Sequence, residues 1–293
     1  MRERYYSKVI LFGEYSMIFD STALMVPLKR FSAQWRFASS LSAQGVAASN
    51  ASLQRFADYL STLDIKDLFD LQRFNRDLQY NLFLDSNVPS GYGLGSSGTL
   101  VAAVYDAYAK EKTNDYLKLK EIFGKMESYF HGSSSGIDPL QCYLGKPFKI
   151  TPKNVEILKD EFLNKDIRIC LIDTKIKSNT KPLVNHFKQQ RENLDFLNRF
   201  QKEYVPYVKK CLNALIWSDK EVFFNSLKRI TKGQLKFLRP MITDNTLALF
   251  TADYDFNFGV KISGSGGGGY VLDFTDDVDK TSDLLKDFEV IWL

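Results

Sequence analysis

The stretch Val88-Pro-Ser-Gly-Tyr-Gly-Leu-Gly-Ser-Ser-Gly-Thr-Leu100 alternates glycine with other residues and runs directly into a helical pattern. Apolar side chains recur at helical spacing at Leu100, Val101, Val104, Ala107 and Tyr108. This spacing predicts a helix that begins near Ser96. The first amides of a helix lack partners within it and attract anions, and glycines let the backbone approach a phosphate closely. The stretch therefore predicts a phosphate-binding loop, with an ordinary serine-capped turn as the alternative. It has neither the Gly-Lys-Ser/Thr ending of a Walker A loop nor the glycine spacing of the dinucleotide fingerprint.

The length and composition indicate a globular protein with a sizeable core. The chain has 293 residues, of which 44% are hydrophobic and 25% are charged, and this length favours two lobes. The net charge is +4, but lysines and arginines are interleaved with acidic residues, so we expect no nucleic-acid partner. Only the short apolar segment Val9 to Phe12 follows the charged N-terminus, which predicts neither a signal peptide nor a membrane span. We expect a cytoplasmic protein.

The cysteines and histidines restrict the chemistry of any site. Cys142, Cys170 and Cys211 lie far apart in the sequence, which favours reduced core residues over a disulfide framework or a zinc site. Two histidines, His131 and His186, are too few for most histidine-based machinery. We therefore expect a carboxylate as any catalytic base.

Hydrophobic periodicity predicts an order of strands and helices along the chain. Strands are expected at 8–12, 31–37, 78–84, 167–172, 260–263, 270–274 and 290–293. Helices are expected at 96–108, 113–131, 181–217 and 219–238, and between the last two strands. The region rich in serine and alanine, 38–52, is interpreted as a connection. A change of pattern near residue 155 indicates a domain boundary.

Three charged residues stand in unusual surroundings. Glu127 lies one turn before the end of its predicted helix, on the same face as Phe123 and Phe130, although a surface carboxylate is the commoner case. Asp138 follows in a loop rich in hydroxyls, where a simple turn residue before proline is the alternative. Lys8 heads an apolar strand, where it could also be a cation at a strand edge.

Four segments together resemble a known family. They are Lys8-Val-Ile-Leu-Phe-Gly-Glu-Tyr15, the stretch from Pro89 to Gly98, His131-Gly-x-x-Ser-Gly-Ile-Asp138 and Lys261-Ile-Ser-Gly-Ser-Gly-Gly-Gly-Gly269. In type and order they resemble the motifs of the GHMP small-molecule kinases, most closely the mevalonate kinases among them. The segment from Asp173 to Val184 resembles the part of these kinases that leads into a helix of the C-terminal domain.

The resemblance implies an α+β fold in two domains. Residues 1–155 would form an ATP-binding domain with a left-handed βαβ crossover, an exception to the usual handedness. Residues 156–293 would form a ferredoxin-like domain, and the active site would lie between the two.

The resemblance also implies residue roles. Asp138 would face the substrate hydroxyl, with Lys8 beside it. The ATP phosphates would be held by Pro89, Gly91, Gly93, Leu94, Gly95, Ser96 and Ser97. Mg²⁺ would be held by Ser97 and Glu127. The substrate side and the closing loop would comprise Glu14, Tyr15, His131, Thr180, Gly264, Ser265, Gly266 and Gly267.

The implied activity is transfer of the γ-phosphate of ATP to the primary hydroxyl of mevalonate. Phosphomevalonate, homoserine or a sugar could be the acceptor instead, and a non-catalytic ligand sensor is the alternative from another class. Two departures from the mevalonate kinase pattern concern the acceptor: Tyr15 stands where histidine is usual, and Ser178 where arginine is frequent. The implied partner is a small molecule, with no nucleic acid and no membrane, and a homodimer is left open.

Overall fold

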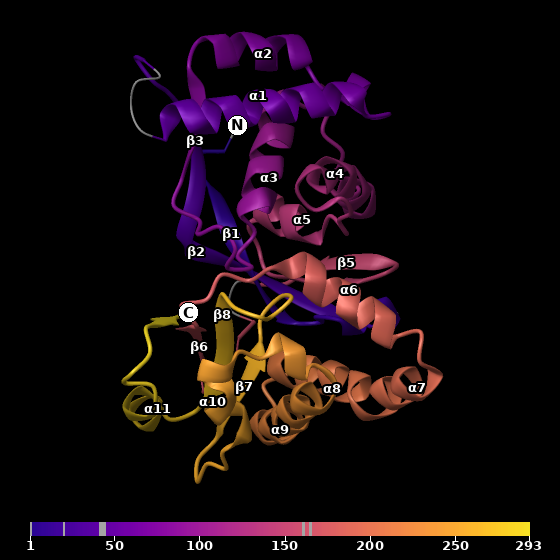
Figure 1. The fold of residues 1–293 in the computed structure, drawn as a ribbon, viewed down its shortest axis with the longest axis vertical. Helices are drawn as coiled ribbons and strands as arrows, with labels where there is room; N and C mark the ends of the chain where they lie inside the picture. Colours follow the sequence, from indigo (N-terminus) through magenta and orange to yellow (C-terminus); the bar gives the residue numbers. More distant parts are fainter. Residues whose placement is uncertain (1, 20, 41–44, 160–161, 164–165) are drawn as a thin grey trace. The chain divides into compact units, whose positions relative to one another are not determined.

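The chain forms a mixed α and β structure, which confirms the α+β class. A computed structural model describes residues 2–19, 21–40, 45–159, 162–163 and 166–293 (Figure 1). The chain divides into two compact units. Unit 1 comprises Met1–Lys8, Pro27–Pro89 and Leu94–Lys146, and unit 2 comprises Val9–Val26, Ser90–Gly93 and Pro147–Leu293. The domain boundary expected near residue 155 stays a prediction.

Unit 1 is built mainly of helices. Its helices are α1 (Val46–Thr62), η2 (Lys66–Leu68), α2 (Leu71–Gln79), α3 (Ser96–Tyr108), α4 (Tyr116–His131) and α5 (Ile137–Leu144). Its strands are β3 (Leu82–Ser86) and the parts of β1 (Tyr5–Phe12) and β2 (Ala23–Phe37) that fall within it. Antiparallel pairing joins β2 to β3, from Ala33 opposite Ser86 to Phe37 opposite Leu82. The central helix is α3, which packs against α4 and α5 and is buried over most of its length.

Local chemistry explains the limits of α4. The carboxylate of Asp115 accepts hydrogen bonds from the amides of Leu117 and Lys118, which caps the N-terminus. Gly132 ends the helix in the left-handed conformation, as the sequence predicts. The predicted helix at 96–108 is likewise confirmed by α3.

Unit 2 contains an antiparallel sheet in the order β7-β8-β6-β9. These strands are β6 (Arg168–Asp173), β7 (Phe258–Ile262), β8 (Tyr270–Thr275) and β9 (Val290–Trp292). The helices are η1 (Ser16–Phe19), α6 (Thr180–Gln190), α7 (Leu194–Glu203), α8 (Val205–Ile216), α9 (Lys220–Phe237), η3 (Arg239–Met241), η4 (Asp244–Thr246), α10 (Leu247–Thr251) and α11 (Val278–Leu284). The hairpin of β4 (Phe148–Thr151) and β5 (Asn154–Ile157) does not belong to this sheet. It belongs to a second sheet, because β4 pairs with the first residues of β2.

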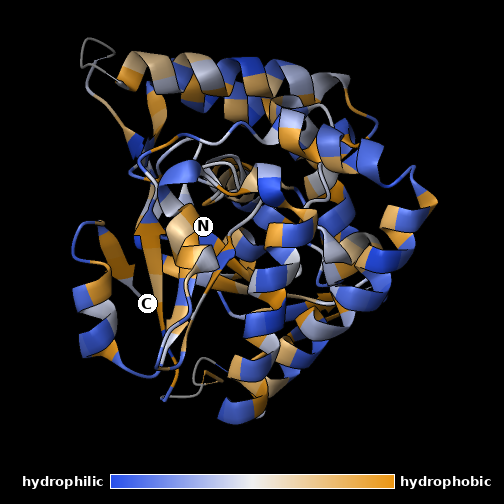
Figure 2. Ribbon diagram, turned by 60° about the horizontal axis from the view of Figure 1, so that its bottom comes forward, coloured by the Kyte–Doolittle hydropathy of each residue, from blue (hydrophilic) through white to orange (hydrophobic). Residues whose placement is uncertain are grey.

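Aromatic packing forms much of the core of unit 2. The ring of Phe223, on α9, lies 5.3 Å from that of Phe274 on β8 and 6.2 Å from that of Phe12. Every residue of β7 and β8 is buried. Figure 2 shows helices in which hydrophilic and hydrophobic residues alternate, as expected for helices with one face against a core.

Three predicted elements were wrong in part. The region 38–52 is not only a connection, because α1 begins at Val46; its first half carries few apolar side chains and so shows no period. The predicted strand at 78–84 begins too early, since Leu78 is the last buried residue of α2 and Asn81 turns the chain at a φ of 60°. The single helix predicted at 181–217 is three helices. Asn193 caps α7, and a proline lies at the start of α8.

The cysteines are free and buried, as predicted. No helix within the described part of the chain is long and apolar enough to cross a membrane.

Candidate active site

The N-terminus of α3 in unit 1 has the properties of an anion site. Gly95 precedes the helix in the left-handed conformation, with φ at 79°, and no side chain of the described residues caps its amides. A Cβ at Gly95 would lie 2.9 Å from Cγ of Lys8 and 3.4 Å from Sγ of Cys142. Glycine is therefore required for both the backbone conformation and the close approach of Lys8.

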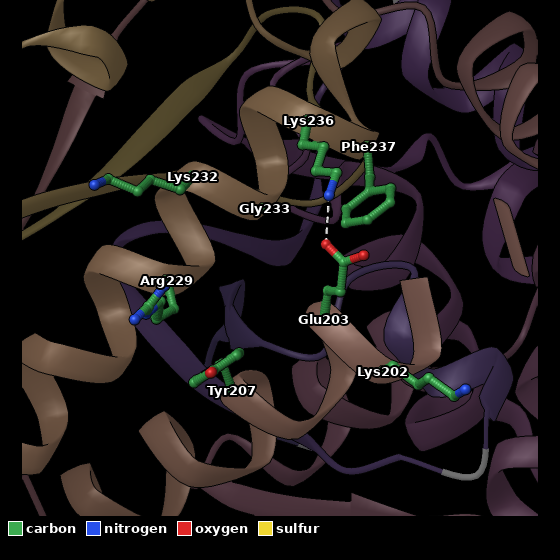
Figure 3. A pocket seen from close by; sticks show the side chains of 8 residues that line it. All are labelled: Lys202, Glu203, Tyr207, Arg229, Lys232, Gly233, Lys236 and Phe237. Atoms are coloured by element: carbon green, nitrogen blue, oxygen red, sulfur yellow. Dashed lines mark hydrogen bonds and ion pairs between the residues drawn. The ribbon is translucent and has the colours of Figure 1, made fainter. Parts of the chain in front are cut away.

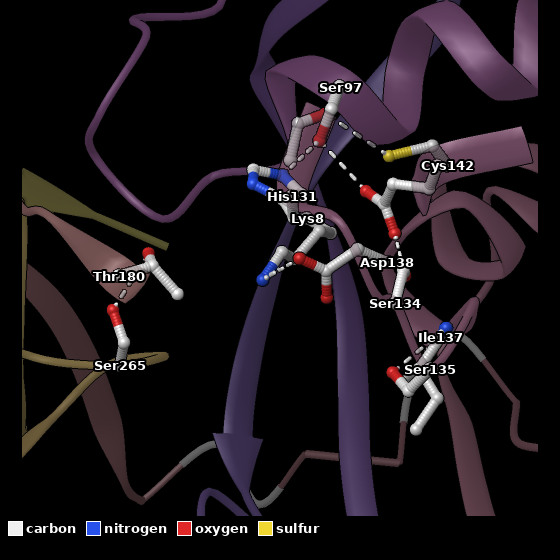
Figure 4. Close-up of polar contacts among 12 residues, drawn as sticks. Lys8, Ser97, His131, Ser134, Ser135, Ile137, Asp138, Cys142, Thr180 and Ser265 are labelled. Carbon is white, nitrogen blue, oxygen red and sulfur yellow. Dashed lines mark hydrogen bonds and ion pairs between the residues drawn. The ribbon is translucent and has the colours of Figure 1, made fainter. Parts of the chain in front are cut away.

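Lys8 and Asp138 form an ion pair beside this helix. The ammonium nitrogen of Lys8 lies 2.8 Å from Oδ2 of Asp138 (Figure 4). The Lys8 side chain is 4% exposed and that of Asp138 is 39% exposed. A buried ammonium requires a partner of opposite charge, while the exposed part of the carboxylate remains accessible to another molecule. Two alternatives from the sequence are corrected: Lys8 lies inside β1 rather than at its head, and Asp138 lies in the first turn of α5 rather than in a loop.

Glu127 and Ser97 form a second polar pair in unit 1. The Ser97 hydroxyl donates to Oε1 of Glu127 at 2.8 Å, and the Ser134 hydroxyl donates to Oε2 at 2.5 Å (Figure 4). Nε2 of His131 lies 3.3 Å from the Ser97 hydroxyl. Burial, and secondly the negative charge of Asp138, raise the pKa of Glu127 to about 7, although both serines and Lys8 oppose this. A cation beside Glu127 would offset the cost of keeping this carboxylate charged.

A separate group of hydroxyls lies in unit 2. The Tyr15 hydroxyl donates to the carbonyl of Ser265 at 2.8 Å, and its ring lies 4.6 Å from that of Phe187. The Ser265 hydroxyl lies 3.1 Å from that of Thr180 and 3.3 Å from that of Ser178. Ser178 in turn donates to the carbonyl of Gly266 at 2.5 Å. The turn after β1 and the start of α6 thus both contact the glycine-rich loop.

The glycine-rich loop, residues 264–269, is closely packed within unit 2. The amide of Gly267 donates to the carbonyl of Met241 at 2.6 Å, and that of Gly269 to the carbonyl of Ile176 at 2.7 Å. A Cβ at Gly268, where φ is 140°, would lie 2.5 Å from the same Ile176 carbonyl oxygen. Only glycine allows this packing.

The predicted site residues therefore fall into two groups. Unit 1 brings together Lys8, Gly95, Ser97, Glu127, His131 and Asp138. Unit 2 contains Glu14, Tyr15, Thr180 and the loop from Gly264 to Gly267. The predicted phosphate loop is shared: Gly91 and Gly93 belong to unit 2, where the Gly91 carbonyl accepts from the amide of Ser178 at 2.8 Å, and Leu94 to Ser97 belong to unit 1.

Part of the chain matches a known protein family. Residues 42–146 match the family described as GHMP kinases N terminal domain. The chain therefore contains a GHMP kinase N-terminal domain. GHMP kinases depend on ATP, so the chain is an ATP-dependent phosphotransferase.

Individual relatives agree with this family. The chain is 25% identical to the mevalonate kinase of Thermococcus onnurineus, with 90% of this chain and 85% of the relative covered. Streptococcus pneumoniae phosphomevalonate kinase in complex with phosphomevalonate and AMPPNP has a similar fold, with a TM-score of 0.67, 16% identity and 99% of each chain covered. L. major mevalonate kinase in complex with R-mevalonate gives a TM-score of 0.66 at 15% identity, covering 98% of this chain and 90% of that one. These similarities confirm the predicted GHMP kinase fold.

The Glu127 and Ser97 side chains fit Mg²⁺ that is held together with a nucleotide. No group of three or more histidine, cysteine, aspartate or glutamate side chains among the described residues could hold a metal alone. Mg²⁺ needs only one or two protein carboxylates when phosphate oxygens and water complete its coordination. The Glu127 carboxylate and the Ser97 hydroxyl are oxygen donors of this type.

Two residues that contact the predicted set were not given a role from the sequence. Ser134 donates to Glu127, and its position in a run of serines after α4 was the available signal. Lys261 pairs with Glu14, and a single charge between Val260 and Ile262 in a buried strand was the corresponding signal.

A hollow of about 280 Å³ in unit 2 contains none of the predicted site residues (Figure 3). The charged side chains that line this hollow do not point toward a common position where a ligand could bind. Lys236 pairs with Glu203, and the Arg229 guanidinium lies 5.9 Å from the centre of the Tyr207 ring. The side chains of Lys202 and Lys232 extend in opposite directions in Figure 3. The active-site assignment therefore rests on the two groups described above.

Proposed function

We propose that the chain transfers the γ-phosphate of ATP to the primary hydroxyl of mevalonate. The observation that carries the proposal is the Lys8–Asp138 pair, which presents a half-exposed carboxylate held by a buried ammonium. Similarity to mevalonate kinases over 90% of the chain supports the choice of acceptor.

Asp138 would orient the acceptor hydroxyl and accept its proton as the oxygen attacks the γ-phosphorus. Phosphoryl transfer needs mainly positioning and charge neutralisation, so one correctly placed carboxylate is sufficient on the acceptor side. Lys8 would fix the orientation of this carboxylate, because its ammonium is buried and 2.8 Å away.

The nucleotide would bind at the N-terminus of α3, with its phosphates against the backbone from Gly95 to Ser97. These uncapped amides and the helix dipole favour negative charge. Ser97 and Glu127 would hold Mg²⁺, which would neutralise charge on the phosphates. In a titration of Mg²⁺ at saturating ATP, Glu127→Gln should raise the Mg²⁺ concentration needed for half-maximal rate; an unchanged value would remove Glu127 from the metal site.

The acceptor would be bound by hydroxyls of unit 2. Tyr15, Ser178 and Thr180 each contact Ser265, and Thr180 is exposed. Hydroxyl groups both donate and accept hydrogen bonds, so they suit the hydroxyl and carboxylate groups of mevalonate.

A coupled assay of ADP release tests the proposal across mevalonate, phosphomevalonate, homoserine and galactose. We expect the highest kcat/KM with mevalonate. A higher kcat/KM with another acceptor would identify that acceptor as the substrate and would still support a kinase. Absence of turnover with every acceptor, together with intact ATP binding, would favour a ligand sensor. A cytoplasmic location and a homodimer stay predictions.

A further inference from the structure

Glu14 and Lys261 form a buried ion pair in unit 2. Nζ of Lys261 lies 2.6 Å from Oε1 of Glu14, and the two side chains are 3% or less exposed. The same ammonium donates to the carbonyl of Ile262 at 2.7 Å and lies 5.6 Å from the centre of the Phe12 ring. Glu14 was expected on the substrate side, but its carboxylate is directed into the protein, toward Lys261.

This pair lies where two functional segments begin. Lys261 is the penultimate residue of strand β7, three residues before the glycine-rich loop starts at Gly264. Glu14 immediately precedes Tyr15, a non-glycine residue with φ at 58°, whose hydroxyl donates to Ser265 in that loop. The pair therefore joins the base of the loop to the turn that contacts its tip.

Ile262, the last residue of β7, is fixed by hydrogen bonds to both its carbonyl and its amide. The carbonyl of Ile262 accepts from Lys261, and its amide donates to Oε1 of Gln234 at 2.8 Å. Gln234 is fixed in turn by a hydrogen bond of 3.0 Å to the Tyr204 hydroxyl. The backbone direction at the point where the loop leaves the strand is thereby fixed.

A contribution to the free energy of folding does not account for the buried Glu14–Lys261 ion pair. Moving two charges out of water costs free energy that their attraction often fails to recover, so apolar residues of similar volume are commonly as stable. Burial lowers the pKa of Lys261 even though the charge of Glu14 opposes the shift, which reflects that cost. A geometric role is the better account of the pair.

We infer that the Glu14–Lys261 ion pair positions the glycine-rich loop, residues 264–269, for phosphoryl transfer. This inference rests on the proposed kinase function and makes both side chains positioning residues. Neither needs to touch ATP or the acceptor. A displacement of about 1 Å in a positioning element costs on the order of 10²-fold in rate, so loss of the pair should reduce kcat.

The test replaces both charges with apolar residues in Glu14→Leu/Lys261→Met. The variant should remain folded, with kcat lowered about tenfold or more and the KM for ATP unchanged. Hydrogen exchange at the amides of Gly267 and Gly269 should become faster, because their hydrogen bonds to Met241 and Ile176 depend on the loop position. The matched control is Glu203→Leu/Lys236→Met, which removes an exposed Glu–Lys pair of the same unit and should change neither readout.

A folded variant with wild-type loop exchange and kcat within twofold of wild type would overturn the inference. If the double variant does not fold, Glu14→Gln replaces it, since glutamine keeps the shape and removes the charge. Exchange of Gly267 and Gly269 should then be faster than in Glu203→Gln, and equal exchange would overturn the inference. The exchange measurement does not need turnover, so failure of the proposed mevalonate kinase activity remains distinguishable from failure of the positioning role.

Discussion

The ammonium of Lys8 lies 2.8 Å from the carboxylate of Asp138, and the two side chains differ sharply in exposure, at 4% and 39%. The cation is enclosed by protein while the carboxylate is accessible from solvent. This difference in exposure suits a carboxylate that contacts a bound molecule and a lysine that orients the carboxylate.

Asp138→Asn should therefore lower kcat by about 10²- to 10⁴-fold, because the amide keeps the shape but cannot accept the proton of the acceptor. ATP affinity measured by calorimetry should remain nearly unchanged. Lys8→Met should also slow transfer, and the double variant should lose less than the product of the two single losses if the residues act as a unit. Near wild-type turnover by Asp138→Asn would exclude this mechanism.

Glu127 should make stability depend on pH in the absence of Mg²⁺. Its pKa is about 7 in the folded protein against an ordinary value of 4.5, with burial the largest cause. Between these pH values the folded state retains a proton that the unfolded state has lost, so the free energy of unfolding should fall as pH rises through this range. Tm measured in EDTA from pH 5 to pH 8 should fall more for wild type than for Glu127→Gln.

The exposed Glu121, on the same helix, supplies the control for this measurement. Glu121→Gln should follow the wild-type curve. Parallel curves for wild type and Glu127→Gln would show that Glu127 is not the group responsible.

Gly95→Ala should weaken ATP binding and lower stability. The backbone conformation alone costs roughly 1–2 kcal/mol for a residue with a Cβ, and that Cβ would lie 2.9 Å from Lys8. Gly45→Ala is the matched control, because φ is also positive there, at 91°, while no atom of the described residues beyond its chain neighbours lies within 4 Å of the added Cβ. Calorimetry should show reduced ATP affinity for Gly95→Ala alone, and equal affinities would remove Gly95 from the nucleotide site.

The sequence predicted elements with a clear period or a clear end. The helix α3 follows from its apolar spacing, and the end of α4 follows from Gly132. The division of 181–217 into three helices was not predicted, because apolar side chains continue at nearly helical spacing across the breaks. Those breaks arise from the side-chain cap at Asn193 and from the proline at the start of α8, which end a helix without changing the apolar spacing.

The candidate site shows the same limit. The motif resemblance placed Lys8 beside Asp138, as the structure has them, but spacing alone could not, since they are distant in the sequence. The resemblance also grouped Glu14 with the substrate side. Only packing reveals that the Glu14 carboxylate is buried against Lys261, because strand β7 and the turn after β1 meet through tertiary contacts.

Thr180→Val tests the hydroxyl group proposed to bind the acceptor. Valine keeps the branched shape and removes the hydroxyl that lies 3.1 Å from that of Ser265. A hydrogen bond contributes about 0.5–1.5 kcal/mol, or up to about 3 with a charged partner, so the KM for mevalonate should rise several-fold to about a hundredfold. The KM for ATP should not change, because the nucleotide contacts are assigned to α3. Thr251→Val, at an exposed threonine that ends α10, is the control and should leave both constants at wild-type values. A rise in the KM for ATP alone would move Thr180 from the acceptor side to the nucleotide side.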